Sequence, residues 1–290
     1  MTSSTLSPTE FAALVEDIRP ELHRYASRMT GSVIDGEDVV QEALIKAYGS
    51  LALLTHTTNL RGWLFRITHN KAIDYLRRFS DEPMELLDET AMIEEPDLPP
   101  DEKELALSMF VKLAPRQRSC VILKDVLGYS LAEISELLDA TVPEIKATLH
   151  RGRTRLHELA EIVEVSAPRL DAHEQMLLAQ YVDRFNARDF DSLRTLLTDE
   201  VRLELYGRAM IKGAAEVSSN YFNKYKEANN CLLALGTVEG RAALLAYDLT
   251  ESAAEPAYFM LLTWENDTVS LIRDYRYIRY VMRDARITLA

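Results

Sequence analysis

Two helix-capping signals lie only eleven residues apart near the middle of the 290-residue chain. Ser130 with Glu133, and Thr141 with Glu144, each place a hydroxyl residue three positions before a glutamate, which is the capping box that begins a helix. Two short helices separated by residues 139–141 have the spacing of a helix-turn-helix. An ordinary helical hairpin with a solvated basic face is the alternative interpretation of this pattern.

The second helix of this pair, expected over residues 142–160, separates apolar from cationic side chains. Ile145, Leu149 and Leu156 recur at helical spacing and are predicted to be buried. A cationic face held by such a buried stripe suits the phosphates and base edges of a DNA groove. The cationic positions off the stripe are Lys146, His150, Arg151, Arg153 and Arg155.

An acidic segment separates this region from the front of the chain. Residues 81–110 hold 1 basic and 11 acidic side chains, and they account for most of the net charge of −13. The total charge therefore excludes no nucleic-acid partner, because residues 1–80 are neutral and residues 111–160 are slightly basic. Residues 81–100 are predicted to be a linker, since they lack helical periodicity and contain Pro83, Pro96, Pro99 and Pro100.

Residues 7–80 have the pattern of a small helical domain. A capping box at Ser7 begins the first helix, and Gly31 is expected to end it. A second helix is expected over residues 36–49 and a third over residues 60–78. The apolar face that the second helix is expected to turn inward comprises Val40, Ala43, Leu44, Ala47 and Tyr48.

Four segments of the chain resemble sigma factors of the extracytoplasmic-function (ECF) type, in the sigma-70 family. Residues 35–48, DGEDVVQEALIKAY, and residues 60–78, LRGWLFRITHNKAIDYLRR, are similar to region 2 of that family. Residues 113–134 and residues 145–153, IKATLHRGR, are similar to its region 4. The resemblance implies a subunit that binds core RNA polymerase and directs −10 and −35 promoter recognition and transcription initiation.

The resemblance also implies domains, partners and site residues. A region 2 helical bundle is expected at residues 7–80 and a region 4 helix-turn-helix domain at residues 101–160, with the β′ clamp and β flap of core polymerase and promoter DNA as partners. An anti-sigma factor is a further partner that the family suggests. Solvated helix faces and a polar loop without a role are the alternatives. Core-polymerase contacts are expected at Asp38, Gln41, Glu42 and Ile45; −10 DNA contacts at His56, Thr57, Asn59, Arg61, Arg66, Lys71, Arg77 and Arg78; and −35 DNA contacts at Arg116, Glu144, Lys146, Thr148, His150, Arg151 and Arg153.

Beyond a second expected linker at residues 161–171, the pattern changes to that of an α+β domain. Hairpin turns are expected at Glu239-Gly240 and Asn266-Asp267. One or two helices precede strand-like runs at residues 200–206, 231–238, 241–250, 257–264 and 268–280.

Within this domain, residues 181–189, 238–242 and 272–277 resemble the SnoaL-like branch of the NTF2-like superfamily. The resemblance implies an α+β NTF2-like cone at residues 172–290 that regulates the sigma domains. The expected fold class is therefore multidomain, with two all-α domains and this cone. A helix-turn-helix repressor fused to a small-molecule-binding or isomerase/cyclase-like domain is the alternative, although a repressor has no need of residues 35–78.

Asp248 and Asp274 are the candidates for a pocket in the C-terminal domain, since free-standing relatives use a pocket carboxylate. Asp248 has the same strand parity as Leu244 and Ala246, so it is expected to point inward. No distinct acid–base constellation accompanies either aspartate, and we expect no enzymatic activity, cofactor or metal site. Arg241, Arg273 and Arg276 are the neighbours expected to satisfy these carboxylates.

Two further features bear on the cellular compartment. No apolar stretch approaches the length that spans a bilayer, and the first residues lack the pattern of a signal peptide, so a cytoplasmic protein is expected. Cys120 and Cys231 lie in segments of different expected domains and are predicted to be buried free thiols.

Overall fold

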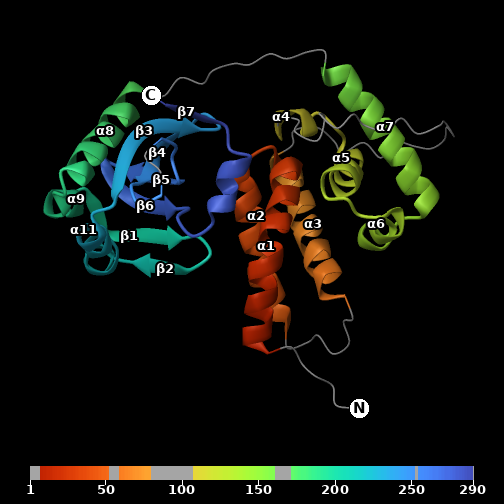
Figure 1. The fold of residues 1–290 in the computed structure, drawn as a ribbon, viewed down its shortest axis with the longest axis horizontal. Helices are drawn as coiled ribbons and strands as arrows, with labels where there is room; N and C mark the ends of the chain where they lie inside the picture. The colour runs from red at the N-terminus through yellow and green to blue at the C-terminus, as the bar shows by residue number, and fades with distance from the viewer. Residues whose placement is uncertain (1–6, 52–58, 80–106, 161–170, 252–253, 290) are drawn as a thin grey trace. The chain divides into compact units, whose positions relative to one another are not determined.

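A computed structural model describes residues 7–51, 59–79, 107–160, 171–251 and 254–289 of the chain (Figure 1). The chain forms two compact units, residues 1–164 and residues 165–290. The first unit is helical and the second is built on a sheet, which confirms the expected fold class of all-α parts followed by an α+β part. The linker predicted at residues 81–100 lies outside the described residues, and so do residues 161–170 of the second predicted linker.

The first helical part of the chain comprises α1 (Pro8–Thr30), α2 (Val33–Ser50) and α3 (Leu60–Phe79). The capping box predicted at Ser7 is present, with Pro8 in the first turn. Gly31 ends α1 as predicted, in a left-handed conformation with φ of 81° that a residue with a Cβ adopts only with strain.

Helix α2 differs from its prediction in two ways. It begins three residues earlier than expected, because the Ser32 side chain accepts a hydrogen bond from the Asp35 backbone N–H at 3.1 Å and caps the helix. The predicted inward face is buried at Val40, Ala43, Leu44 and Ala47. The prediction that Tyr48 shares this buried face is wrong. Tyr48 is 59% exposed, and the centre of its ring lies 6.0 Å from that of Phe11.

The second helical part comprises α4 (Leu107–Phe110), α5 (Pro115–Val121), the π-helix η3 (Ile122–Val126), α6 (Leu131–Leu138) and α7 (Val142–Ala160). The capping boxes at Ser130 and Thr141 are both present, so α6 and α7 form the predicted helix-turn-helix. Between them Asp139 takes the left-handed conformation, with φ of 51°, that ends α6.

One hydrophobic core runs through both helical parts of this unit. Tyr25 and Phe65 of the first part lie in the same cluster of buried side chains as Cys120, Ile122 and Leu149 of the second. The predicted stripe of α7 belongs to this core, since Ile145, Leu149 and Leu156 are at most 2% exposed. The two parts are therefore packed against each other rather than held apart by their connection.

The C-terminal unit packs helices on a curved mixed sheet. The strand order in the described residues is β2-β1-β6-β5-β4-β3-β7, with β1 parallel to β6 and the other neighbours antiparallel. Leu178, Tyr181 and Phe185 of α8 are buried with Leu244 and Ala246 of β4, so α8 covers one face of the sheet. The elements are α8 (Ala172–Asn186), α9 (Phe190–Thr195), β1 (Leu197–Leu205), β2 (Ala209–Lys212), α10 (Ala214–Val217), η4 (Ser218–Phe222), α11 (Asn223–Ala228), β3 (Cys231–Val238), β4 (Arg241–Asp248), β5 (Tyr258–Glu265), β6 (Thr268–Asp274), η5 (Arg279–Arg283) and β7 (Ile287–Leu289).

Sequence periodicity placed β3, β5 and both hairpin turns to within one residue; β1 begins three residues before its predicted start, β4 ends two residues before its predicted end, and the largest difference is at the end of β6. The run predicted as a strand over residues 268–280 ends at Asp274. The Asp274 carboxylate accepts a hydrogen bond from the Arg276 backbone N–H at 2.8 Å, and this side-chain turn bends the chain out of the sheet. The short strands β2 and β7 were not predicted.

Two further expectations can be compared with the structure. Cys120 and Cys231 are free and buried, as predicted. Among the helices of the described residues, none combines the length and the apolar character needed to cross a bilayer.

Candidate nucleic-acid interface

The outer face of α2 carries the residues predicted to contact a polymerase. Ile45 is 67% exposed, and Tyr48, about one helical turn further on, is 59% exposed, which the sequence did not predict. Glu42 is exposed, whereas Asp38 and Gln41 are half-buried. These five residues, which we call the α2 face, make an acidic and partly apolar surface.

Two arginines predicted to contact −10 DNA are engaged within the chain. Arg61, at the start of α3, lies between two acids of α1, with its guanidinium 2.7 Å from the Asp17 carboxylate and 2.5 Å from that of Glu21. Arg66, further along α3, donates a hydrogen bond to the backbone oxygen of Glu136 in α6 at 2.6 Å. The second contact joins the two helical parts.

The other described members of the predicted −10 set lie along α3. Lys71 forms an ion pair with Glu42 at 2.9 Å, which links this set to the α2 face. The Asn59 side chain caps α3, because its oxygen accepts a hydrogen bond from the Gly62 backbone N–H at 2.8 Å. Arg77 and Arg78 are exposed near the end of α3, and His56 and Thr57 lie outside the described residues.

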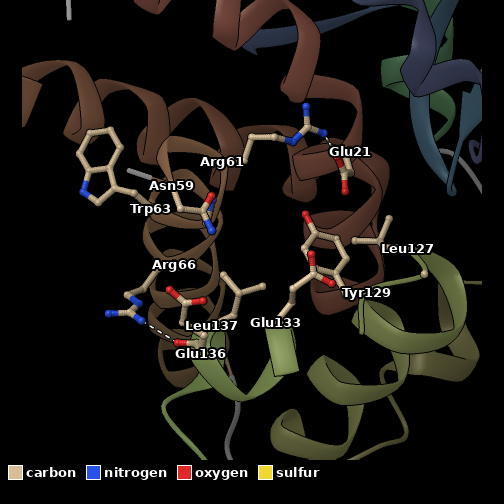
Figure 2. Close-up of a pocket in the computed structure, with 12 residues that line it drawn as sticks. Glu21, Asn59, Arg61, Trp63, Arg66, Leu127, Tyr129, Glu133, Glu136 and Leu137 are labelled. Carbon is tan, nitrogen blue, oxygen red and sulfur yellow. Dashed lines mark hydrogen bonds and ion pairs between the residues drawn. The ribbon is translucent and has the colours of Figure 1, made fainter. Parts of the chain in front are cut away.

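A cleft of about 580 Å³ lies between α3 and the segment from Leu127 to Leu137, which follows η3 and includes most of α6 (Figure 2). Arg61 and Arg66 project into it from α3, and Tyr129, Glu133 and Glu136 line it from the other side. Its walls thus combine cations of the first helical part with acids of the second. The ring of Tyr129 also packs against Phe65 of α3, edge to face, at 5.3 Å.

The residues predicted to contact −35 DNA divide into exposed and buried groups. Lys146 and Arg116 are exposed, and His150 and Arg151 are half-buried. Glu144 is exposed and caps α7; its hydrogen bonds from the Thr141 backbone and hydroxyl lower the pKa of the carboxyl. Thr148 and Arg153 are only 4% and 6% exposed.

The burial of Arg153 has a specific cause. Its guanidinium forms two hydrogen bonds with the Asp125 carboxylate of η3, at 2.7 Å and 3.1 Å. Asp125 is nearly as buried as Arg153, so the pair is a desolvated salt bridge that holds α7 to η3. Arg153 was predicted to lie on the cationic face of α7, and that prediction is wrong because Asp125, 28 positions earlier, pairs with Arg153 and is buried with it.

A buried polar network between α1, α3 and α5 was missed by sequence reasoning. The Arg118 guanidinium donates to the backbone oxygens of Met29, Val111 and Leu113, the last two at 2.7 Å and 2.9 Å, and burial lowers its pKa to about 10. Arg118 lies four positions before the buried Ile122, so helical periodicity could have predicted that Arg118 is buried as well.

A second chain of contacts crosses the same boundary. The Tyr25 hydroxyl of α1 donates to the Ser119 hydroxyl of α5 at 3.1 Å. It also lies 2.7 Å from Nδ1 of His69 in α3, and burial lowers the pKa of that imidazole to about 4.

The C-terminal unit contains a buried acid–tyrosine cluster around Asp274. The Asp274 carboxylate accepts hydrogen bonds from the hydroxyls of Tyr221 at 2.7 Å and Tyr225 at 3.1 Å. The hydroxyls of Tyr225 and Tyr258 lie 2.9 Å apart, and Cys231 Sγ lies 3.4 Å from the Tyr258 hydroxyl. Complete burial raises the pKa of the Asp274 carboxyl.

Asp248, the other predicted pocket residue, has different partners. Its carboxylate accepts hydrogen bonds from the Thr250 hydroxyl at 2.6 Å and from Arg279 at 3.1 Å. The Thr250 bond is the main reason that the pKa of Asp248 is lowered. Asp248 and Asp274 thus have different hydrogen-bond partners among the described residues, and no hydrogen bond joins the two carboxyl groups there. Among the described residues no group of three or more His, Cys, Asp or Glu side chains could hold a metal ion.

Comparison with known proteins identifies two family regions in the helical unit. Residues 14–81 match the family model for Sigma-70 region 2, and residues 98–156 match that for Sigma-70, region 4. The ECF RNA polymerase sigma factor SigG of Mycobacterium tuberculosis is 32% identical over 228 residues, which cover 68% of this chain and 61% of SigG. The chain thus spans less than two thirds of the length of that relative.

Two solved structures resemble the chain or its C-terminal unit in fold. The extracytoplasmic function sigma factor SigJ of Mycobacterium tuberculosis aligns with 92% of this chain and 95% of its own, at 20% identity and a TM-score of 0.35. An NTF2-like protein of unknown function from Cytophaga hutchinsonii aligns with 34% of this chain and 95% of its own, at 21% identity and a TM-score of 0.27.

Proposed function

Since the chain belongs to the sigma-70 family of RNA polymerase sigma factors, in its extracytoplasmic-function group, we propose that it binds core RNA polymerase and directs promoter recognition and transcription initiation. The observation that carries this proposal is the presence of both functional regions in one unit. The exposed α2 face lies in a region 2 match, and the helix-turn-helix lies in a region 4 match. A repressor would need only the second of these.

The α2 face is the proposed contact with the β′ clamp of core polymerase. Its acidic groups suit a basic partner, and exposed Ile45 and Tyr48 supply apolar area at the centre of a contact. Reversing the charges with Asp38→Arg and Glu42→Arg is expected to weaken core binding at least tenfold. Folding should change little, because Glu42 is exposed and its ion pair with Lys71 contributes less than about 1 kcal/mol.

The test is a titration of core polymerase with the full chain, labelled at its N-terminus. Glu16→Arg is the matched control, since it reverses one exposed acid of α1 away from the α2 face. Unchanged affinity of the Asp38→Arg, Glu42→Arg variant, with circular dichroism equal to wild type, would remove the α2 face from the proposal.

The exposed and half-buried cationic side chains of α7, together with the exposed Arg116 of α5, are the proposed −35 contacts. Lys146 and Arg151 are expected to bind phosphates or base edges, and Arg116 and His150 flank them. Thr148 and Arg153 have a structural role instead, because both are buried. Lys146→Ala and Arg151→Ala are each expected to lower −35 affinity by a factor that corresponds to about 1–3 kcal/mol if a base is read. Lys112→Ala, an exposed lysine before α5, is the control.

The proposed −10 contacts are the α3 cations Arg61, Arg66, Lys71, Arg77 and Arg78, together with Asn59 and with His56 and Thr57, which lie outside the described residues. Each cation that is paired in this structure must exchange its acid or carbonyl partner for a phosphate. We therefore expect −10 binding to depend steeply on salt.

The C-terminal unit is proposed to regulate the sigma unit by contact rather than by chemistry. A tethered unit meets its target at an effective concentration that reaches about millimolar for a short connection. Ending the chain at residue 165 is therefore expected to change transcription strongly, whereas Asp248→Asn should change it little. If Asp248→Asn alone reproduced the truncation, a catalytic or ligand-binding carboxylate would be the better explanation. An anti-sigma partner stays a prediction.

A further inference from the structure

One end of the C-terminal sheet carries an arginine whose guanidinium has no acceptor. Arg276 follows β6 and is half-buried, yet its guanidinium makes no hydrogen bond or ion pair with any residue that the structure describes. A guanidinium offers five N–H donors, and a partly desolvated one is costly unless an anion or a carbonyl supplies acceptors. The other half-buried arginines of this unit in the described ranges all have an acceptor or an ion pair; they are Arg184, Arg188, Arg273 and Arg279.

The acid two positions before Arg276 is already engaged. One oxygen of the Asp274 carboxylate accepts the hydroxyls of Tyr221 and Tyr225, at 2.7 Å and 3.1 Å, and the other accepts the Arg276 backbone N–H at 2.8 Å. The Arg276 guanidinium lies instead over two tyrosine rings, 4.9 Å from the centre of Tyr225 and 5.9 Å from that of Tyr258. Asp274 therefore fixes the backbone of Arg276 and leaves its side chain without a carboxylate partner.

The acids near the end of the neighbouring strand β4 are engaged as well. The Asp248 carboxylate accepts a hydrogen bond from Arg279 at 3.1 Å, and Glu251 pairs with the same guanidinium. Arg279 also lies over the Tyr258 ring, 5.7 Å from its centre. Two guanidinium groups thus lie against one ring, and only Arg279 has carboxylate partners.

The strand register brings these groups to one end of the sheet. Asp248 at the end of β4 pairs with Cys231 at the start of β3, and Tyr258 begins β5, which lies on the other side of β4. Arg188 reaches the same end and donates to the Cys231 backbone oxygen at 2.8 Å. Burial raises the pKa of the Cys231 thiol, and the charges of Arg276 and Arg188 both oppose that rise. Positive charge therefore gathers at this end.

We propose that Arg276 anchors a binding site for a small organic carboxylate at this end of the C-terminal unit. A guanidinium can bind a carboxylate through two parallel hydrogen bonds while it stays stacked on aromatic rings. The tyrosine rings make the surroundings partly apolar, which favours a carboxylate with a short apolar chain over inorganic phosphate. The site goes beyond the proposed regulation by contact, because it gives the regulatory unit a ligand to which it can respond.

A titration of the isotope-labelled full chain with sodium butyrate tests the site. Chloride keeps the ionic strength constant, so that general screening of charge does not change. The arginine Nε–Hε signals are followed by nuclear magnetic resonance, and the signal of Arg276 is identified by its absence from Arg276→Lys. We expect this signal to shift along a saturable curve for one site. Arg194, an exposed arginine of α9, is the matched control, and its signal should not shift.

A conservative variant shows whether the planar guanidinium is what binds. Arg276→Lys keeps a positive charge near Tyr225 and Tyr258 but loses the two parallel donors, so it should weaken butyrate binding by about tenfold or more. The backbone N–H of Tyr258 reports binding in this variant. Arg194→Lys should leave the dissociation constant unchanged. Equal affinity of wild type and a folded Arg276→Lys variant would contradict the role of Arg276, and the wild-type titration decides the proposal even if the variant unfolds.

Other results of the wild-type titration would also overturn the proposal. A shift of the Arg276 signal that does not saturate, or equal shifts at Arg276 and Arg194, would mean that butyrate acts only as a surrounding ion. Inorganic phosphate, titrated in the same way, should bind more weakly than butyrate, and equal or tighter binding of phosphate would remove the carboxylate as the ligand class. No polymerase or promoter enters these measurements, so their failure would leave the proposed sigma function standing.

Discussion

The two units of this chain bury their polar groups in different ways. In the helical unit, Arg118, Tyr25 and Ser119 lie at a boundary between two parts, and each keeps a hydrogen-bond partner on its own side. In the C-terminal unit, Asp274 is completely buried in one core, and Tyr221 of η4 and Tyr225 of α11 donate hydrogen bonds to it. Hydrogen bonds of the first arrangement cross between two helical parts, whereas those of the second stay within a single core.

This difference indicates how each unit can act. A boundary whose polar groups stay satisfied on separation can open at a cost set mainly by its apolar area. The buried Asp274 carboxylate has tyrosine partners that all belong to its own core, so opening that core would leave the carboxylate without them. We therefore expect the helical unit to work by rearrangement of its parts and the C-terminal unit to act as one rigid body.

The largest expected effect is at the centre of the C-terminal core. Asp274→Ala removes the acceptor of two tyrosine hydroxyls and of the Arg276 backbone N–H, so it should destabilise this unit by about 3 kcal/mol or more. Urea unfolding followed by Trp264 fluorescence in a Trp63→Phe background measures it, since the chain has only these two tryptophans.

Asp248→Ala is the matched control for that change. The Asp248 carboxylate is buried, but it is bonded to the Thr250 hydroxyl and to the partly exposed Arg279, so the expected loss is smaller, about 1–2 kcal/mol. Equal losses for the two variants would mean that Asp274 is not the central polar group of this core.

A similar loss is expected inside the second helical part. Arg153→Ala leaves the buried Asp125 carboxylate unpaired and should cost about 3 kcal/mol, since both members of this pair belong to the same part. Arg151→Ala, two positions away, should cost less than about 1 kcal/mol while weakening −35 binding. A small stability loss for Arg153→Ala, accompanied by weakened DNA binding, would return Arg153 to the DNA contacts.

Capping chemistry explains which of these features could be read from the sequence. Ser130 with Glu133, and Thr141 with Glu144, are signals contained within four residues, so the helix-turn-helix was predictable. Arg153 was misplaced because the partner that buries it, Asp125, is distant in sequence. Asp274 itself was named as a candidate from the sequence, but its partners Tyr221 and Tyr225 were missed, because they lie about 50 positions away and share no local pattern with it.

Lowering the pH should change the stability of the two units in opposite directions. The buried His69 has its pKa lowered to about 4, so the folded helical unit binds fewer protons than the unfolded chain and loses stability as pH falls from about 6.5 towards 4. The loss expected by pH 5 is about 1–2 kcal/mol. His69→Gln should remove it, as measured by urea unfolding at pH 7 and pH 5 with Trp63 as the reporter.

The Asp274 carboxyl is expected to make the stability of the C-terminal unit change with pH in the opposite direction. Its pKa is raised above the ordinary value of 3.8, so its contribution is complete below that pH and is lost as pH rises through the folded pKa. Asp274→Asn should therefore flatten the pH dependence of the C-terminal unit on the acidic side. Parallel pH profiles for the two units, unaffected by either substitution, would contradict the assigned burial of both groups.

The smallest expected effects compare single hydroxyl groups in the two settings. Ser119→Ala removes one hydrogen bond across the boundary, and because Tyr25 keeps His69 the helical unit should lose only about 0.5 kcal/mol. Tyr225→Phe removes a hydroxyl that contacts both Asp274 and Tyr258, so the C-terminal unit should lose about 1.5 kcal/mol. Urea unfolding measures the first loss with Trp63 in a Trp264→Phe background and the second with Trp264 in a Trp63→Phe background. A loss for Ser119→Ala as large as that for Tyr225→Phe would mean that the boundary is a fixed core, and the distinction between a unit that opens and a unit that does not would fail.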